Sequence, residues 1–312
     1  MSQFQHTAVL GAGVIGASWA ALFLASGRSV AIYDPTPDSE ASVRKYIEQS
    51  WPVLTQLGLT TNGNADNLSF HSSAVDAVAN AAFIQESVPE RIEIKHTLYQ
   101  QIESAMEPEA VIASSASGLT LSEMQAGFSN PAPLVLGHPF NPPHLIPLVE
   151  VMGNETTGAG VVVKAEAFYK AIGKVTIRVN KEVPGHVANR LQAAVWREAI
   201  HMISTGVASV EDVDTAMWAG PGLRWAVMGP TMLFHLGAGE GGLEEFCERY
   251  TPSFNRWWDD LGELHLNPEI AKQLVNGVNE ESGKASAAQL SKKRDEMLAA
   301  ILAATKNLRN ET

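Results

Sequence analysis

The segment 7–34 limits what this chain can fold into more than any other part of the sequence. A short apolar run at 7–10 leads into Gly11-Ala12-Gly13-Val14-Ile15-Gly16, an apolar helical stretch continues to Ala25, and a second apolar run at 29–33 ends in Asp34. A strand, a glycine turn, a helix and a strand that ends in an acid form the fingerprint of a dinucleotide-binding βαβ unit. The sequence therefore predicts a Rossmann-type domain with NAD as its cofactor.

Each part of this fingerprint has a physical task. Gly11 permits a tight turn, Gly13 lets a pyrophosphate approach the backbone, and Gly16 allows the helix to pack closely on the strand. The start of the helix offers free N–H groups and the positive end of the helix dipole to the phosphates. We expect Asp34 to accept hydrogen bonds from the adenosine ribose. Its charge would repel the 2′-phosphate of NADP, and residues 35–37 provide no arginine to hold that group.

The rest of the first half has the rhythm of an α/β fold. Short apolar runs alternate with helical stretches such as 92–106, which predicts a mostly parallel sheet covered by helices. We interpret the segments 36–66 and 153–160 as polar connections. The apolar runs lie at 82–85, 111–114, 134–137, 148–151 and 175–178.

The character of the sequence changes near Pro184-Gly185. Runs of β-branched residues end there, and helical periodicity takes over. One helix is expected to end at Gly206, Ser209 is expected to cap the next, and 286–308 has the pattern of an amphipathic tail helix. We therefore predict an α/β Rossmann-type domain at 1–184, followed by an all-helical domain at 185–312 for substrate binding and dimerisation.

Composition and charge argue against some classes of binding partner. A net charge of -12 argues against nucleic acid or an anionic membrane, since both are bound through positive surface. The single cysteine, Cys247, cannot form an internal disulfide, and residues 1–6 lack the basic and apolar regions of a secretory signal. We therefore expect a cytoplasmic protein. No metal is expected, because the nine histidines are dispersed without the spacing of a ligand set.

A candidate acid–base pair belongs to the third and fourth of the apolar runs given above, 134–137 and 148–151. His138 follows a buried run directly, within Gly137-His138-Pro139-Phe140-Asn141-Pro142, and Glu150 lies in the next run. If the two runs are neighbouring strands, the carboxylate can hold one tautomer of the imidazole and raise its basicity. His138 could then accept a hydroxyl proton near neutral pH. Pattern alone leaves open an incidental structural pair.

Three motifs together carry a family resemblance. They are the His138 motif, Ser114-Ser115-Ala116-Ser117-Gly118, and Pro184-Gly185-His186-Val187-Ala188-Asn189-Arg190. In this order they resemble the 3-hydroxyacyl-CoA dehydrogenase superfamily over nearly the whole chain. The resemblance implies that NAD oxidises an L-3-hydroxy substrate to a 3-keto product.

The same resemblance implies roles for single residues. His138 would be the general base and Glu150 its orienting partner. Ser117 would hydrogen-bond the substrate oxygen, and Asn189 would help to place the substrate. The implied cofactor-binding residues are Gly11, Gly13, Val14, Ile15, Gly16, Asp34, Glu90 and Lys95.

The substrate class depends on two further segments. Residues 36–70 contain only Arg44 and Lys45 as basic side chains, which is a poor site for the phosphates of CoA, so we expect a free acid. Arg224 lies in an apolar stretch framed by glycines, where a buried charge is costly unless it meets an anion. Its planar fork suits a carboxylate, although pairing with a nearby glutamate or with carbonyls is an alternative.

Two groups of the superfamily share a Gly-x-Arg-aromatic pattern at Arg224. The run Leu223-Arg224-Trp225 is most similar to carnitine dehydrogenases, and the gulonate 3-dehydrogenase and lambda-crystallin group comes next. A trimethylammonium substrate favours aromatic faces, and five of the seven tryptophans, Trp225 among them, follow residue 190. We therefore expect L-carnitine as substrate, with L-gulonate, another 3-hydroxy acid or a 3-hydroxyacyl-CoA as alternatives. A crystallin-like structural protein and an NAD sensor are the non-enzymatic alternatives.

Overall fold

The computed structural model describes residues 4–305, which divide into two compact units. The first consists of residues up to Ala188 together with residues from Lys292 onward, and the second of Asn189–Ser291. The sequence-based division at residue 184 stays a prediction of domain structure. From Lys292 onward, the last helix is grouped with the first unit and not with the second.

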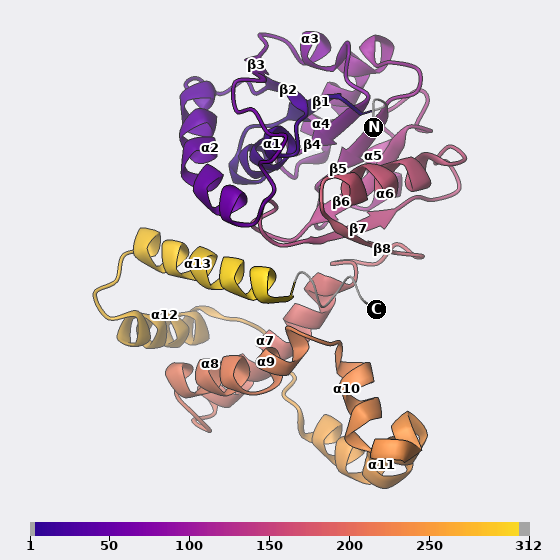
Figure 1. Cartoon of the computed structure of the whole chain (residues 1–312). Helices are drawn as coiled ribbons and strands as arrows, with labels where there is room; N and C mark the ends of the chain where they lie inside the picture. The colour runs from indigo at the N-terminus through magenta and orange to yellow at the C-terminus, as the bar shows by residue number, and fades with distance from the viewer. Residues whose placement is uncertain (1–3, 306–312) are drawn as a thin grey trace. The chain divides into compact units, whose positions relative to one another are not determined.

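An eight-stranded sheet forms the centre of the first unit, in the order β3-β2-β1-β4-β5-β6-β7-β8. Neighbouring strands are parallel except β6 and β7, which are antiparallel. Figure 1 labels these strands. Their bounds are β1 His6–Leu10, β2 Ser29–Tyr33, β3 Leu68–Phe70, β4 Phe83–Glu86, β5 Val111–Ser114, β6 Leu134–Pro139, β7 Leu148–Met152 and β8 Val175–Arg178.

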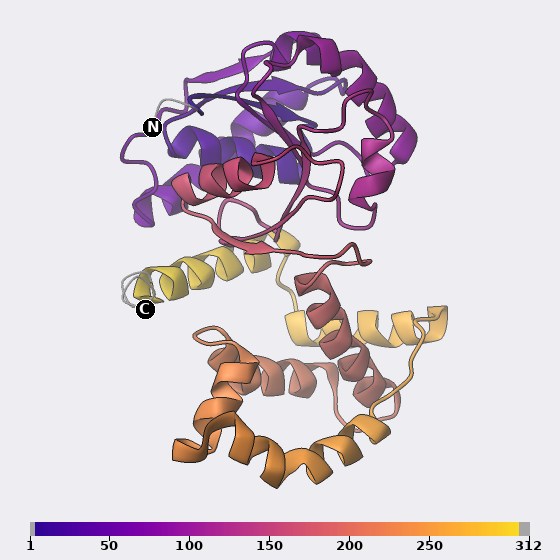
Figure 2. The same ribbon diagram turned by 90° about the vertical axis from the view of Figure 1, so that its right-hand side faces the viewer.

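Helices cover both faces of this sheet, which is why its central strands are buried and mostly apolar. In β1, Val9 packs into the core under α1, α2 and α6, and its neighbours Ala8 and Leu10 pack under α3, α4 and α5. Figure 2 shows helices on both sides of the sheet. The predicted α/β fold with a mostly parallel sheet is confirmed. The helices are α1 Val14–Ala25, α2 Ser39–Gln56, α3 Ala74–Val78, α4 Ile92–Ile102, α5 Leu121–Gln125 and α6 Val161–Ala171, with a 3-10 turn at Glu103–Ala105.

The interpretation of 36–66 as a polar connection is wrong. Helix α2 occupies 18 residues of this segment, with Val43, Ile47 and Leu54 buried on one face. The segment looks polar because the other face of the helix is solvated, and Pro52 lies inside the helix, where proline is disfavoured. The segment 153–160 is a connection, as predicted.

The second unit is helical. Ser209 caps α8 by accepting a hydrogen bond from the Asp212 N–H, as predicted, and α7 ends two residues before Gly206. The tail helix is also present, although residues 306–308 of its predicted span lie outside the described part of the chain. The helices are α7 Ala188–Ser204, α8 Val210–Ala219, α9 Pro221–Trp225, α10 Pro230–Gly237, α11 Gly242–Asp260, α12 Pro268–Ser282 and α13 Ala287–Thr305, with a 3-10 turn at Gly239–Gly241.

Among residues 4–305, no helix is both long enough and apolar enough to cross a bilayer.

Candidate active site

The glycine turn after β1 contains two glycines that the packing requires and one that it does not. Gly11 has a φ of +91°, and a Cβ there would lie 2.6 Å from the backbone of Ser87; a Cβ on Gly16 would lie 1.8 Å from the Gly11 carbonyl oxygen. Both positions therefore require glycine for packing. A Cβ on Gly13 would meet nothing within 4 Å, so this position borders open space.

That open space is suited to a dinucleotide. Gly13 is the N-cap of α1, and Val14 and Ile15 are the first two residues of the helix. Because Gly13 has no side chain, the first N–H groups of the helix donate no hydrogen bond to an N-cap side chain. At the end of β2, the Asp34 carboxylate accepts hydrogen bonds from the N–H of Ala12 at 2.6 Å and of Thr36 at 2.8 Å. These bonds fix the carboxylate beside the turn and leave lone pairs for ribose hydroxyls. The chain's own residues therefore fit NAD.

His138, Glu150 and Ser117 form one hydrogen-bonded line. His138 and Glu150 lie directly opposite each other in the antiparallel pair β6·β7, and His138 Nδ1 is 2.8 Å from Glu150 Oε2. His138 Nε2 is 3.1 Å from Ser117 Oγ, which follows β5. A carboxylate can only accept, so Nδ1 carries the hydrogen, and in the neutral ring Nε2 is the basic nitrogen. The geometry therefore places the basic Nε2 of His138 next to the Ser117 hydroxyl, which can donate a hydrogen bond.

The charge on Glu150 is supported by backbone donors. Its Oε1 accepts hydrogen bonds from the N–H groups of Val187 and Ala188, both at 2.9 Å. Burial alone would raise the pKa of Glu150, but the bond from His138 and the two backbone bonds outweigh it and lower the pKa. Glu150 is therefore ionised when His138 is neutral.

His186 packs against His138. Its backbone has a φ of 51°, which helps to turn the following N–H groups toward Glu150, and its ring centroid is 5.1 Å from that of His138. Nε2 is 3.4 Å from the Ala116 carbonyl oxygen, and buried Nδ1 has no partner among the described residues. Burial lowers the pKa of His186, so the ring adds no charge beside His138 at neutral pH. The sequence reasoning missed it, although its place directly before the residues bound to Glu150 is a signal.

Glu90 and Lys95 lie near this line in different ways. Glu90 Oε1 accepts hydrogen bonds from the N–H groups of Ser117, Gly118 and Leu119, at 2.8 Å from Ser117 and 3.1 Å from Leu119. Burial would raise the pKa of Glu90, but these donors lower it. Glu90 therefore fixes the turn that carries Ser117.

Lys95 is 1% exposed, and its ammonium bonds both oxygens of Glu86, at 2.6 and 2.8 Å. Tyr99 and Ser114 donate to the same carboxylate at 2.7 Å. Lys95 therefore stabilises the end of β4 from within the buried interior and does not lie on an exposed surface of the site. The acid Glu86, which sequence reasoning missed, could have been found as the last residue of a buried strand.

The loop after β6 is held by another buried lysine. Lys174 donates to the Ile146 carbonyl oxygen at 2.7 Å and to that of Pro143, and its Nζ lies 5.0 Å from the centre of the Trp19 ring. Burial lowers the pKa of Lys174 to about 7. These bonds tie the loop that follows His138 to the sheet. Nothing in the sequence pattern had pointed to Lys174.

The remaining predicted residues belong to the second unit. Asn189 is the second residue of α7 and follows Ala188, whose N–H is bound to Glu150. Arg224 and Trp225 are the last two residues of α9. Arg224 is exposed and Trp225 is 38% exposed, so the expectation that Arg224 is a buried charge is wrong. The glycine-framed stretch forms a short surface helix, where an arginine is solvated.

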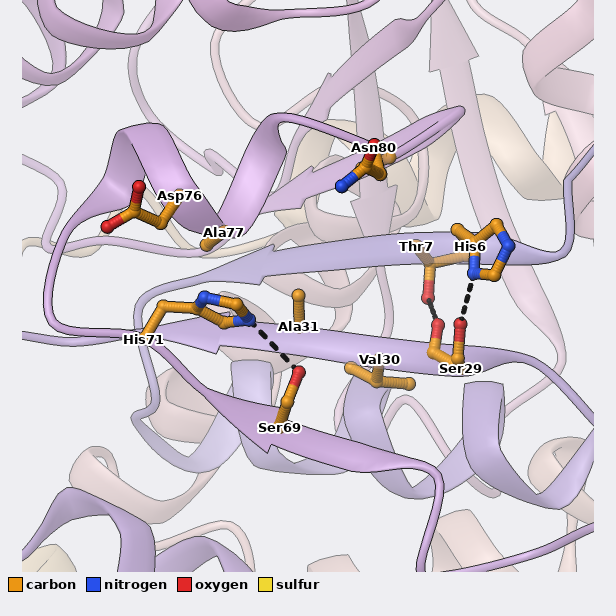
Figure 3. A pocket seen from close by; sticks show the side chains of 11 residues that line it. His6, Thr7, Ser29, Val30, Ala31, Ser69, His71, Asp76, Ala77 and Asn80 are labelled. Carbon is orange, nitrogen blue, oxygen red and sulfur yellow. Dashed lines mark hydrogen bonds between the residues drawn. The ribbon is translucent and has the colours of Figure 1, made fainter.

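A separate hollow of about 230 Å³ lies against β1, β2, β3 and α3 (Figure 3). Its polar groups bond each other, with His6 Nδ1 2.7 Å from Ser29 Oγ and Ser69 Oγ 3.0 Å from His71 Nε2. His6 and Ser29 are the first residues of β1 and β2, at the opposite end of the strands from Gly11. This hollow is therefore distinct from the open space beside Gly13.

Family models match most of the chain. Residues 6–183 match the NAD-binding domain of 3-hydroxyacyl-CoA dehydrogenase, and residues 185–276 match its C-terminal domain. Similar curated proteins include the L-carnitine dehydrogenase of Streptomyces coelicolor, at 45% identity over 97% of this chain and 96% of that protein. The L-carnitine dehydrogenase of Pseudomonas putida is 39% identical over 98% of this chain and 96% of that protein.

The fold is also similar to a solved structure. The crystal structure of 5-formyl-3-hydroxy-2-methylpyridine 4-carboxylic acid 5-dehydrogenase, an NAD+-dependent dismutase, superposes with a TM-score of 0.84 at 30% identity. The match covers 97% of this chain and 99% of that one. Identity at this level over nearly the whole length indicates common ancestry of both units.

Proposed function

Because this chain belongs to the 3-hydroxyacyl-CoA dehydrogenase family and is an NAD-dependent 3-hydroxy acid dehydrogenase, we propose that its substrate is L-carnitine. The product would be 3-dehydrocarnitine. The line Ser117–His138–Glu150 is the observation that carries the reaction type. The relatives named L-carnitine dehydrogenase, at 39–45% identity, support the substrate.

The proposed reaction depends on the direction of the hydrogen bonds in the line Ser117–His138–Glu150. His138 Nε2 accepts the proton of the substrate hydroxyl, and ionised Glu150 stabilises the imidazolium that forms. The Ser117 hydroxyl then donates to the substrate oxygen as negative charge develops there, and the Asn189 amide is a second donor. When bound, NAD supplies the hydride acceptor for this oxidation. Gly11, Gly13, Val14, Ile15, Gly16 and Asp34 would hold it, with Glu90 and Lys95 supporting the loops around it.

A free acid fits this chain better than a CoA thioester. The basic residue Arg44 is already engaged by Glu40 at 2.7 Å, which leaves little positive charge on α2 for phosphates. Arg224 is exposed and able to pair with a carboxylate, and Trp225 beside it offers an aromatic face to a trimethylammonium group. We propose Arg224 and Trp225 as the two substrate-recognition residues.

The test follows NADH absorbance with purified protein, NAD and five candidate substrates. They are L-carnitine, D-carnitine, L-gulonate, L-3-hydroxybutyrate and its CoA thioester. L-carnitine is expected to give the highest kcat/KM. Arg224→Met is expected to raise KM for L-carnitine about 10- to 100-fold, and Trp225→Ala about 3- to 30-fold. Arg249→Met, which removes an exposed arginine paired with Glu245, is the matched control and should leave KM unchanged.

Other outcomes have definite meanings. A preference for L-gulonate would keep His138 and Arg224 in their roles but overturn the cation–π assignment of Trp225. A preference for the thioester would overturn the free-acid proposal.

We further propose a homodimer formed through the second unit, because large apolar side chains are exposed there on several helices. The expectation of a cytoplasmic protein, which depends on its cysteine content, stays a prediction.

A further inference from the structure

A chain of polar side chains runs from the interior of the first unit to the carboxyl end of β4. Tyr169 OH donates to Gln85 Oε1 at 2.7 Å, and Gln85 Nε2 donates to Ser115 Oγ at 2.9 Å. Ser115 Oγ is in turn 2.9 Å from Ser87 Oγ. Tyr169 and Gln85 are fully buried, whereas Ser87 is partly exposed. The proposed reaction uses none of these four side chains.

The orientation of the Gln85 amide is fixed by its surroundings. Its Nε2 also lies 3.2 Å from the Ala113 carbonyl oxygen and 3.4 Å from that of Gly137. A flipped amide would place Oε1 against these two acceptors, so Nε2 is the atom that faces them and Ser115. In this hydrogen bond Gln85 Nε2 is therefore the donor and Ser115 Oγ the acceptor.

Ser115 has one direction left for its own hydrogen. The indole Nε1 of Trp19, which can only donate, also points at Ser115 Oγ, at 3.3 Å. With two donors, both lone pairs of this hydroxyl are used. Its hydrogen must then go to Ser87 Oγ, and the Ser87 hydrogen is left over. Among the described residues, the Ser87 hydroxyl has no hydrogen-bond partner other than Ser115.

Ser87 lies where a dinucleotide crosses the sheet. It is the first residue after β4, its N–H donates to the Leu10 carbonyl oxygen at 2.7 Å, and its backbone touches Gly11 at the end of β1. Chain order reverses between β1 and β4, since β2 and β3 lie on one side and β5 on the other. Ligands of open α/β sheets bind at this switch point, outside the carboxyl ends of the strands.

We propose that Ser87 is a cofactor-binding residue whose hydroxyl donates to an acceptor oxygen of NAD beyond its adenosine monophosphate half. That oxygen belongs to the second phosphate of the pyrophosphate or to the ribose attached to it, which share the required chemistry. Trp19 and Gln85 act through Ser115 as positioning residues, because they force the Ser87 hydrogen outward. The proposal depends on NAD as cofactor and not on the identity of the substrate, so its failure and a failure of the L-carnitine assignment are distinguishable.

The test measures binding rather than turnover. Affinities of the intact protein for NADH, ADP-ribose and AMP are determined by calorimetry for the wild type and for Ser87→Ala. Ser87→Ala is expected to weaken NADH and ADP-ribose about 5- to 20-fold and to leave AMP unchanged. Ser87→Thr, which keeps a hydroxyl, should restore most of the affinity. Ser69→Ala removes a hydroxyl from β3, away from Gly11, and should have no effect.

A double-mutant cycle tests the outward direction. Trp19→Phe frees a lone pair on Ser115, so that Ser87 can donate inward, and NADH affinity should fall about 2- to 5-fold. In the Ser87→Ala background the same change should have no further effect. Wild-type NADH affinity in Ser87→Ala, an equal loss for AMP, or an equal effect of Trp19→Phe in both backgrounds would overturn the proposal. Thermal unfolding of each variant separates these results from loss of fold.

Discussion

At the scale of single residues, the direction of proton transfer in the proposed reaction depends on which nitrogen of His138 carries the hydrogen. Glu150 can only accept a hydrogen bond, so it fixes the hydrogen on Nδ1 and leaves Nε2 basic. The donors Val187 and Ala188 keep Glu150 ionised at the moment when the imidazole becomes a cation. The base is therefore prepared by the strand pairing and by the turn before α7, before any substrate is present.

His138→Gln is expected to lower kcat about 100- to 10,000-fold, because glutamine keeps polarity and approximate size but cannot accept the proton. Binding of NADH should be unchanged, which fluorescence titration measures. His265→Gln, which changes an exposed histidine, is the control for the effect of a histidine-to-glutamine substitution as such. Turnover within a few-fold of the wild type would remove His138 from the role of general base.

Glu150 also predicts a pH dependence of stability. Its pKa in the folded chain lies below the ordinary value of 4.5, so the ionised carboxylate stabilises the fold above that value and the contribution is lost as pH falls through the folded pKa. From about pH 5 to about pH 3, the Tm of the wild type should fall more steeply than that of Glu150→Gln. Exposed Glu155→Gln should follow the wild type. Parallel curves for all three proteins would contradict the assignment.

The pairing of His138 with Glu150 could be predicted from sequence, but the surroundings of the two residues could not. His138 and Glu150 lie twelve positions apart in two consecutive apolar runs, which is enough to suggest neighbouring strands. Exposure depends on which helix covers a residue, and sequence gives only a weak signal of that. This is why Arg224 was expected to be buried and is exposed, and why nothing predicted the burial of Lys95 against Glu86.

At the scale of elements, the turn from β1 into α1 combines two demands in one glycine motif. Gly11 and Gly16 are required because neighbouring backbone leaves no room for a Cβ. Gly13 borders open space, so its lack of a side chain serves a ligand rather than the fold.

This distinction predicts opposite results for two alanine variants. Gly13→Ala should change Tm by less than about 3 °C and weaken NADH binding about tenfold or more, because the new methyl group occupies the space that the pyrophosphate needs. Gly16→Ala should lower Tm by more than about 10 °C or abolish folding, because its Cβ overlaps the Gly11 carbonyl oxygen. Calorimetry and thermal unfolding measure both effects.

The same pair of variants can also fail the prediction. If Gly13→Ala binds NADH as the wild type does, the space beside this turn is not the cofactor site. If Gly16→Ala keeps its Tm, the close approach of α1 to the turn is not required.

Most elements of the first unit were predictable, because buried strands of parallel sheets are nearly continuous apolar runs. The short strand β3, helix α2 and the direction of β7 are among the features that were not. Helix α2 buries only a narrow face and contains Pro52, so its pattern is weak. The reversal of β7 is also hidden, since an apolar run has no direction; the Pro142-Pro143 loop connects two strands that turn out to be antiparallel.

At the scale of the whole molecule, the two units differ in how well they bury apolar surface. The first has two extensive cores on the two faces of its sheet. The second has a small core around Ile203, Val210 and Val213, while tryptophans and aliphatic side chains on its helices are exposed. The change from strands to helices near residue 185 was visible in the sequence. Which apolar residues of the helices lack cover was not, because amphipathic patterns do not tell a core from an interface.

Exposed apolar surface on this scale predicts self-association, since monomeric proteins rarely present large contiguous apolar patches. The second unit exposes Trp218 to 66%, on α8. In sedimentation equilibrium the wild type should have twice the chain mass of 33.5 kDa, and Trp218→Glu should shift the protein toward the monomer, because a buried carboxylate at an interface is costly. Val163→Glu changes a 56% exposed valine on α6 of the first unit and should leave the dimer intact. A monomeric wild type, or a dimer that Val163→Glu disrupts and Trp218→Glu does not, would place the interface elsewhere or exclude it.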